Sequence, residues 1–280
     1  MTEVNHFRRV LLIWLASSVV LTPLVVFLFA PLVPPGQGSV QASGQVQDNT
    51  ILFALATPIA LAVLVFIGYE LIVFRERDPA ATVEGPAIRG NATIQLWWLM
   101  VTTTIVLFLA GYATYRMFVD GAGGGQGPIP ASVPVTKSTG PPLQVQVIAQ
   151  QWEFTYRYPG YGGVETSRLE LPAYRLIEFH VTSLDVVHSF WAYELAVKAD
   201  ANPGFDNIAF VKTRGPRLFD IRCAELCGVW HGYMADHGQV VPATQFATWI
   251  KQQQQRFAPA TKSLPPYSRS YFPDPQRRGG

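Results

Sequence analysis

The sequence predicts a membrane-anchored chain in which an α-helical hairpin, preceded by one further apolar segment, is followed by an all-β domain outside the membrane. Apolar residues make up 49% of the chain and charged residues only 14%, which is a low share for a soluble protein. Three long apolar runs fall in the first 118 residues. From residue 143 onward, short stretches alternate apolar and polar residues, as half-buried strands do.

The three apolar runs are long enough to cross a bilayer, because a spanning helix needs about 20 predominantly apolar residues. They occupy residues 10–32, 51–74 and 94–118. Tryptophans near one end of the third run and tyrosines near the other suit the two membrane interfaces. The sequence therefore predicts three spans that are in contact with membrane lipid.

Basic residues orient these spans. Arg8 and Arg9 precede the first span, and three arginines lie between the second and third spans, namely Arg75, Arg77 and Arg89. The 33–50 loop between the first and second spans has no Lys or Arg. Because basic loops stay in the cytoplasm, everything after residue 118 is predicted to lie outside. The formal net charge of +2 is too small to indicate nucleic-acid binding.

The first apolar run also allows a second interpretation, a cleaved signal peptide. Arginines precede the run, and the small residues of VQASG (40–44) follow it, as they do in such signals. The apolar part of a signal is usually about 7–15 residues long, and this run is longer, which favours a retained helix. Both interpretations place the C-terminal half outside.

The outer half is predicted to be a β-sandwich or barrel, because short strands alternate with turns rich in Gly and Pro. Strands are expected at 143–150, 152–158, 175–183, 207–213 and 217–223, and a helix at 243–257, with a surface tail from Ala258. The predicted organisation is a span or signal with its loop (1–50), a helical hairpin (51–118), a Gly/Pro-rich linker (119–142), the β-domain (143–250) and a polar tail (251–280).

The stretch CAELCGVWHGYM, residues 223–234, contains the only two cysteines of the chain, Cys223 and Cys227. Outside the membrane such a pair often forms a disulfide, and buried free thiols are the next alternative. His231 and Met234 follow within seven residues of Cys227, and glycines 228 and 232 permit the tight turns that converging ligands need. These neighbours favour a metal site over either alternative.

A distant histidine, His188, ends the run LDVVH and is placed to reach the same site from a neighbouring strand. Thiolate, imidazole and thioether together suit copper better than a hard cation. A mononuclear blue-copper site uses one cysteine, so here one is left over, and a closed zinc site has no use for a methionine. Two copper ions that share both thiolates account for all five side chains.

The segments DVVHSFW (185–191) and CAELCGVWHGYM resemble the dinuclear copper site, CuA, of cytochrome c oxidase subunit II. The resemblance covers roughly residues 51–250 and implies a cupredoxin-like Greek-key barrel. It implies that both cysteines bridge the two coppers, with His188 and His231 as terminal ligands. It also implies two weak ligands, Met234 and the carbonyl of Glu225. The Glu225 carboxylate would hold a magnesium or manganese ion shared with the catalytic subunit.

The segment QQWEFTYRYPGY (150–161) is similar to the family's aromatic segment, in which a tryptophan receives electrons from cytochrome c. Trp152 occupies that place. The alternative is that Trp152, Phe154 and Tyr156 merely line one face of a strand, as their spacing of two allows. Acidic residues of this half, Asp185 among them, would steer a basic cytochrome c toward the site. His180 and His237 are expected not to be ligands.

The resemblance implies a subunit II that accepts single electrons from cytochrome c and passes them to haem a in the catalytic subunit I. Oxygen would be reduced to water there, coupled to proton translocation, and this chain alone would reduce no oxygen. Gln95 stands where many relatives have a glutamate at the start of a proton path, so that role is in doubt here. The expected location is a bacterial plasma membrane, with the copper domain on the periplasmic side and other oxidase subunits as partners.

Three alternatives remain at this point. The first is the copper subunit of a nitric oxide reductase, which shares the ligand pattern. The second is a copper-delivery or assembly protein, which would usually lack the full set of ligands. The third is a quinol oxidase subunit, a class that has lost the copper ligands present here.

Overall fold

The computed structural model describes residues 5–33, 36–75, 90–120 and 141–263. They form two compact units, one built from the apolar helices and one from the strands. The loop with Arg77 and Arg89, most of the expected linker and the last residues of the tail lie outside the described residues.

Three long apolar helices confirm the predicted membrane spans. Each is long and apolar enough to cross a membrane, and none of their apolar windows is buried within the chain. Side chains this apolar need lipid or partner helices around them. The helices are α1 (His6–Leu24), continued by the turns η1 (Val25–Phe29) and η2 (Ala30–Leu32), then α2 (Val40–Val73) and α3 (Ala92–Asp120).

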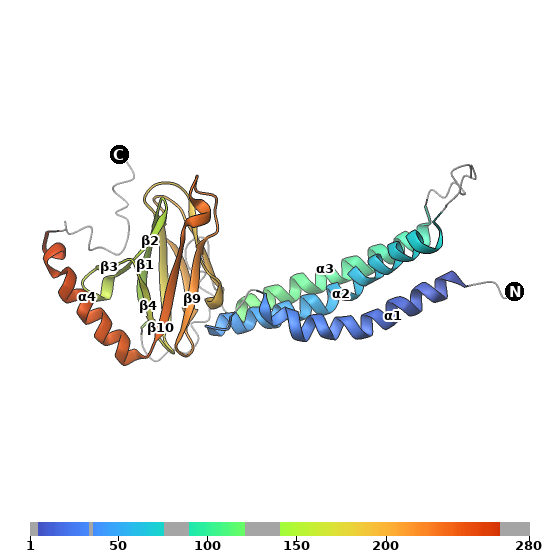
Figure 1. The fold of residues 1–280 in the computed structure, drawn as a ribbon, viewed down its shortest axis with the longest axis horizontal. Helices are drawn as coiled ribbons and strands as arrows, with labels where there is room; N and C mark the ends of the chain where they lie inside the picture. Colours follow the sequence, from blue (N-terminus) through green and yellow to red (C-terminus); the bar gives the residue numbers. More distant parts are fainter. Residues whose placement is uncertain (1–4, 34–35, 76–89, 121–140, 264–280) are drawn as a thin grey trace. The chain divides into compact units, whose positions relative to one another are not determined.

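Helices α1 and α2 (Figure 1) contact each other at a few points through hydrogen bonds and ring contacts. The indole N–H of Trp14 donates to the carbonyl of Pro58 over 2.8 Å. Near one end His6 Nδ1 lies 2.8 Å from the Tyr69 hydroxyl. Toward the other end of the first apolar run, the ring of Phe29 meets the ring of Phe53 of α2 edge-on, with 5.5 Å between the ring centroids. This packing favours α1 as a structural helix of the protein.

The segment between these two helices is bound to the β-domain by backbone hydrogen bonds. The N–H of Gly38 donates to the carbonyl of Glu194 over 2.8 Å, and the N–H of Arg214 donates to the carbonyl of Gly38 over 2.9 Å. Ser39, which is fully buried, donates its hydroxyl to the carbonyl of Leu195 over 2.6 Å. We call residues 36–42 the strap.

The strap bears on the signal-peptide interpretation. The small residues of VQASG lie in the first turns of α2, and Ala42 and Gly44 are buried. A side chain in place of Gly38 would begin only 2.7 Å from the Leu195 side chain, so the strap depends on glycine for this close approach. Removal of the first span at this point would break the strap, which favours a retained helix.

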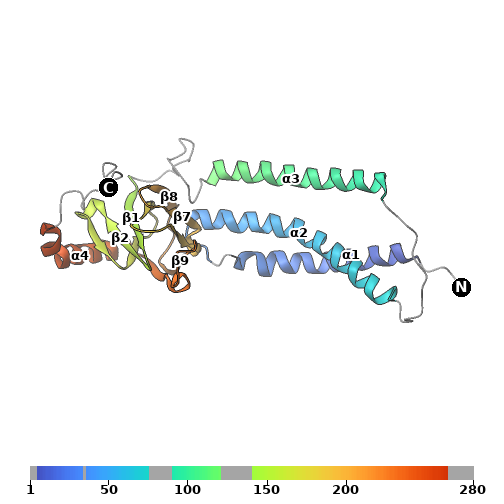
Figure 2. The same cartoon turned by 90° about the horizontal axis from the view of Figure 1, so that it is seen from above.

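The β-domain is a two-layer structure of ten strands within residues 141–263 (Figure 2). One sheet has the order β3-β2-β1-β5-β8 and the other β4-β10-β9-β6-β7. The pairs β1–β5 and β4–β10 are parallel and the remaining pairs are antiparallel. The strands are β1 (Leu143–Gln150), β2 (Glu153–Tyr158), β3 (Val164–Thr166), β4 (Leu169–Pro172), β5 (Leu176–Ser183), β6 (His188–Ala192), β7 (Val197–Ala201), β8 (Asn207–Lys212), β9 (Arg217–Cys223) and β10 (Ala235–Val241).

Alternation of apolar and polar residues explains why the five predicted strands are present. Strand β2, for example, buries Phe154, Tyr156 and Tyr158 and leaves the residues between them partly exposed or exposed. Both sheets supply side chains to one core, among them Phe179 from β5 and Phe219 from β9. The predicted all-β domain with a cupredoxin-like two-sheet build is therefore confirmed.

Five strands were not predicted, namely β3, β4, β6, β7 and β10. Most of these strands are short, and the polar residues and the glycine of β10 are a sequence pattern that is typical of a loop. In the fold Gly238 of β10 lies directly under the ring of Phe219, and a Cβ atom at this position would lie only 2.1 Å from that ring. Glycine is thus required by packing in the middle of a strand.

Helix α4 (Ala243–Ser263) follows β10 in the sequence and packs against the β-domain (Figure 1). Its buried Phe246 and half-buried Trp249 pack against the ring of Tyr158. The predicted helix ended at residue 257, and the predicted domain ended at residue 250. The structure extends the helix to Ser263, because glutamine-rich sequence after Trp249 is compatible with a helix whose apolar face is already docked.

Candidate metal centre

Two loops at one end of the sheets bring the predicted ligands together. His188 is the first residue of β6, and Cys223 is the last residue of β9. Cys227 lies in the loop between β9 and β10. His231 belongs to a short turn in the same loop, and Met234 directly precedes β10. Ligands from these separate elements meet because β6 and β9 are neighbours in one sheet.

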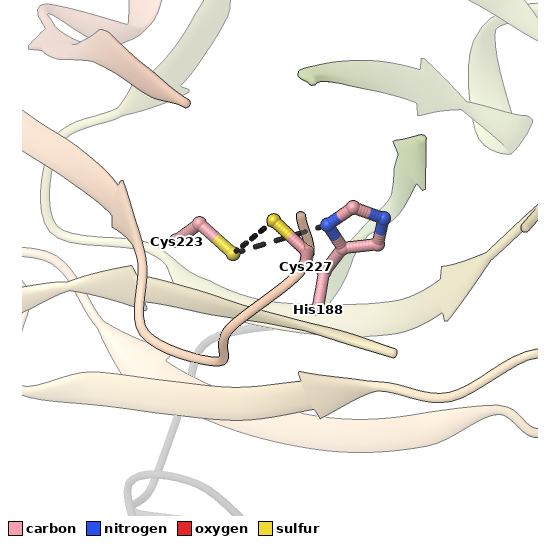
Figure 3. Close-up of side chains that lie close together, drawn as sticks. All are labelled: His188, Cys223 and Cys227. Carbon is pink, nitrogen blue, oxygen red and sulfur yellow. Dashed lines mark hydrogen bonds between the residues drawn. The ribbon is translucent and has the colours of Figure 1, made fainter. Parts of the chain in front are cut away.

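The two sulfur atoms form the centre of the cluster. The Sγ atoms of Cys223 and Cys227 lie 3.7 Å apart and face each other (Figure 3). A disulfide would require about 2.05 Å, so the structure has two free thiols. His188 points its Nδ1 at Cys223 Sγ over 3.9 Å, and the three ligand atoms all lie within 4.8 Å of one another.

Each sulfur has a matching set of neighbours. Cys223 Sγ has His188 Nδ1 as described and the carbonyl oxygen of Glu225 at 3.2 Å. Cys227 Sγ has the Nδ1 of His231 at 3.5 Å and the Sδ of Met234 at 3.9 Å. Every sulfur thus has one imidazole and one weak donor. The arrangement has an approximate twofold character.

The cluster is sheltered from water. His188 is fully buried, and Cys227 and Met234 are 3% and 2% exposed. Burial, together with the hydrogen bond and charge of Cys223, raises the pKa of the Cys227 thiol to about 12. Without metal this thiol stays protonated at neutral pH, so metal uptake releases a proton.

Trp152 contacts the metal loop directly. It lies in the turn before β2, not in the strand as predicted, and is half-buried against the core. Its indole N–H donates to the carbonyl of Cys227 over 3.1 Å, and the side-chain amide of Gln151 donates to the same oxygen over 2.9 Å. Packing alone does not account for this hydrogen bond.

Asp185 is a neighbour of the cluster whose place sequence reasoning missed. Its Oδ1 lies 2.9 Å from the Nε2 of His188, the ring nitrogen that faces away from the sulfurs. Desolvation alone would raise the pKa of Asp185, but hydrogen bonds from the backbone of Gln151, from His188 and from the backbone of Val186 lower it. The spacing Asp-x-x-His was the available signal.

The rings of His180 and His237 and the side chain of Glu225 have other surroundings than the two sulfurs. His180 is buried between Glu178 and Asp206, at 3.1 and 2.7 Å. His237 is exposed and lies 2.6 Å from an Asp220 oxygen. The Glu225 side chain is exposed, while its carbonyl oxygen points at Cys223.

The donor set fits copper. Two thiols, two imidazoles and a thioether are soft or intermediate ligands, and within the part of the chain that the structure describes no carboxylate contacts either sulfur. Fold and site together define a membrane-anchored, cupredoxin-like protein with a copper-type Cys/His/Met cluster.

Comparisons with known proteins agree with this class. Residues 165–241 match the family model "Cytochrome C oxidase subunit II, periplasmic domain". The cytochrome c oxidase subunit 2 of Thermostichus vulcanus is 28% identical over 260 residues, which are 79% of this chain and 78% of the relative. The Synechocystis subunit 2 is 26% identical and covers 71% of this chain and 69% of its own length. The solved periplasmic domain of the Bradyrhizobium japonicum subunit II is 29% identical, with a TM-score of 0.41, and covers 44% of this chain and 99% of its own.

The β-domain of this chain belongs to the family of cytochrome c oxidase subunit II periplasmic domains, and the similarity to the subunits 2 of these relatives extends over most of the chain. The chain is therefore a subunit of a haem-copper oxidase complex, in which electrons from cytochrome c pass through a copper site. This membership favours the oxidase over the nitric oxide reductase, copper-delivery and quinol oxidase alternatives.

Proposed function

We propose that the copper site of this subunit is dinuclear and is held by His188, Cys223, Cys227, His231 and Met234. The observation that supports it is the matching environment of the two sulfurs, each with one imidazole Nδ1 and one weak donor within 3.9 Å. A mononuclear site would leave one of these sets without a metal. A copper pair bound there would take up one electron at a time and share its charge between both metals.

The residues of the chain would keep that centre rigid and dry. His188 and Cys223 sit at the ends of strands with a buried core, and Cys227, His231 and Met234 lie in the loop between two of these strands, so the ligands need little movement when the charge of the centre changes. The burial of His188 and Cys227 excludes water from between the ligand atoms. Such a site is suited to relaying electrons and offers no open position for a substrate.

Trp152 is the residue that we assign to electron acceptance from cytochrome c. Its indole N–H hydrogen bond to Cys227 connects its partly exposed ring directly to the backbone of a copper ligand. The electrons would then pass to haem a in the catalytic subunit I, and oxygen would be reduced there with translocation of protons. Other oxidase subunits and membrane lipid would surround the three apolar helices.

Glu225 would serve two metals through different atoms. Its carbonyl oxygen lies 3.2 Å from Cys223 Sγ and would be the weak ligand of one copper. Its carboxylate is exposed, as a group shared with another subunit must be in the isolated chain. Carboxylates are suitable ligands for magnesium or manganese, so this side chain would hold such an ion at the boundary with the catalytic subunit.

The location that we propose is a bacterial plasma membrane with three spans and the copper domain on the periplasmic side. The three apolar helices support membrane insertion, and the matched family domain is periplasmic by its description. Arg8 and Arg9, ahead of the first span, support a cytoplasmic N-terminus.

Electron paramagnetic resonance and metal analysis of the purified complex test the dinuclear site. A seven-line hyperfine pattern with two coppers per subunit at this site is expected. A four-line signal from a single copper, or a disulfide in the loaded protein, would refute it.

A pair of matched variants tests the electron-accepting residue. Trp152→Phe should slow reduction by cytochrome c and leave the copper content unchanged. Trp230→Phe is the control, because Trp230 is a half-exposed tryptophan of the same metal loop whose ring meets the Tyr233 ring edge-on. Equal rates in the Trp152 variant and the unmutated complex would contradict the assignment.

A further inference from the structure

Asp185 connects the loop that leads to His188 with the turn between β1 and β2. Besides its 2.9 Å contact with His188 Nε2, it accepts the backbone N–H of Gln151 through Oδ2 over 2.7 Å. The backbone N–H of Val186 donates to Oδ1 over 2.7 Å, and Ser183 lies within hydrogen-bond distance as well. The carboxylate is therefore fixed from several sides and is not a freely rotating surface group.

The contact with His188 determines which ring nitrogen faces the sulfurs. An ionised carboxylate only accepts hydrogen bonds, so the Nε2 of His188 must carry the proton. In the neutral ring the lone pair is then on Nδ1, which lies 3.9 Å from Cys223 Sγ on the side of the sulfurs. Among the described residues, His231 has no such partner at its Nε2, so the two imidazoles are supported differently.

Gln151 extends this contact to the cysteine loop. Its backbone N–H binds Asp185, while its side-chain amide binds the Cys227 carbonyl over 2.9 Å, next to the hydrogen bond from Trp152. Gly228 allows this approach, since a Cβ there would lie 3.0 Å from the Gln151 amide nitrogen. One continuous chain of hydrogen bonds thus runs from His188 through Asp185 and Gln151 to Cys227.

We propose that Asp185 and Gln151 are positioning residues of the copper site, which fix His188 relative to the cysteine loop next to Trp152. Asp185 holds the His188 ring in the metal-binding tautomer and orientation. Gln151 joins Asp185 to the carbonyl of Cys227, which also accepts the indole N–H of Trp152. The loop of His188, the cysteine loop and the Trp152 ring are thus connected by hydrogen bonds. This inference rests on the proposed copper site and assigns to Asp185 a role beyond steering of cytochrome c.

The chemistry gives a direction for each effect. A carboxylate on the distal nitrogen makes the imidazole a stronger donor, and its negative charge favours the more positive, oxidised state of the metal site. Loss of the carboxylate should therefore raise the reduction potential of the site. Loss of an orienting partner of a ligating histidine typically lowers metal affinity about 10–100-fold.

Two substitutions of Asp185 separate positioning from charge. Asp185→Ala removes both the hydrogen bond and the charge, so we expect about 10–100-fold weaker copper binding, altered hyperfine splitting and a higher reduction potential. Asp185→Asn keeps an oxygen that accepts from Nε2 but loses the charge and the acceptor for the Gln151 N–H, so copper affinity should recover in part while the potential stays raised. Glu153→Gln is the control, because Glu153 is an exposed acid near Trp152 that does not contact His188.

The measurements are made on the purified oxidase complex: copper affinity against a chelator, the paramagnetic resonance spectrum and a redox titration of the site. Wild-type values of all three in Asp185→Ala would overturn the proposal, as would an equal shift of the potential in Glu153→Gln. If the oxidase complex does not assemble with Asp185→Ala, the test uses Asp185→Asn alone. An unchanged reduction potential in Asp185→Asn would then overturn the proposal.

The experiments distinguish a wrong dinuclear site from a wrong positioning role of Asp185. A four-line signal in the unmutated complex would refute the proposed function. Copper affinity lost in Asp185→Ala and partly restored in Asp185→Asn would still support the positioning of His188.

Discussion

Gly228 and Gly232 lie four residues apart in the same metal loop, and the structure predicts opposite consequences for their replacement by alanine. Gly228 has φ +116°, a conformation that L-residues rarely adopt, and its Cβ would lie 3.0 Å from Gln151 Nε2 and 3.2 Å from the Trp152 ring. Gly232 has no atom within 4 Å of its Cβ position and no such φ.

The magnitude follows from these two features. A side chain held in a sparsely populated backbone region costs about 1–3 kcal/mol. Displacement of the Gln151 amide from the Cys227 carbonyl removes a hydrogen bond with a net worth of about 0.5–1.5 kcal/mol. Gly228→Ala should therefore lower the free energy of unfolding by about 2–4 kcal/mol. Gly232→Ala should stay within about 0.5 kcal/mol of the unmutated protein.

The assay has two readouts. Guanidinium unfolding of the chain in detergent, followed by tryptophan fluorescence, gives the free energy of unfolding. The copper content of the purified complex reports on the metal loop and should fall in Gly228→Ala only. Equal effects of both substitutions on stability and copper would refute the argument from φ and close approach.

Three further predictions concern the β-domain and the strap. Burial raises the pKa of Glu170 more than Arg168 lowers it, so stability should fall as pH rises through that pKa. Glu170→Gln should therefore be more stable than the unmutated chain at pH 8 and differ little from it at pH 4. The same difference in unfolding free energy at both pH values in chemical denaturation would contradict this. Gly38→Ala, whose Cβ would lie 2.7 Å from Leu195, should lower the melting temperature of the β-domain, and an unchanged value would refute the strap packing. The intact mass of the mature chain should include the first span, and cleavage near Ala42 would disprove its retention.

Much of the fold could be predicted because its signals are local. The three spans follow from apolar length, and the five predicted strands follow from alternation of two residues. Strand β6 was missed because its five residues combine a polar His188 with a buried environment that only its neighbours β7 and β9 create. Strand β10 was missed because Gly238 looks like a turn residue until the ring of Phe219 is placed over it.

The candidate site divides along the same line. The residue types and the spacing of Cys223, Cys227, His231 and Met234 indicated copper without any coordinates, because they lie within twelve residues. Pairing of each sulfur with its own imidazole and weak donor required the fold, since His188 comes from a different strand. The place of Trp152 in a turn, with its indole on the Cys227 carbonyl, is also a property of the tertiary structure.

By itself the sequence determined that the chain enters a membrane, that an outer β-domain follows and that soft metal ligands gather in one short stretch. These are properties of composition and spacing, which act over a few residues at a time. Only the tertiary structure decided that Asp185 holds the distal nitrogen of His188 and that Gln151 joins this contact to Cys227. The Asp185–His188 contact spans only three residues, but the contacts of Gln151 with Asp185 and with Cys227 join residues 34 and 76 apart, and no local pattern encodes them.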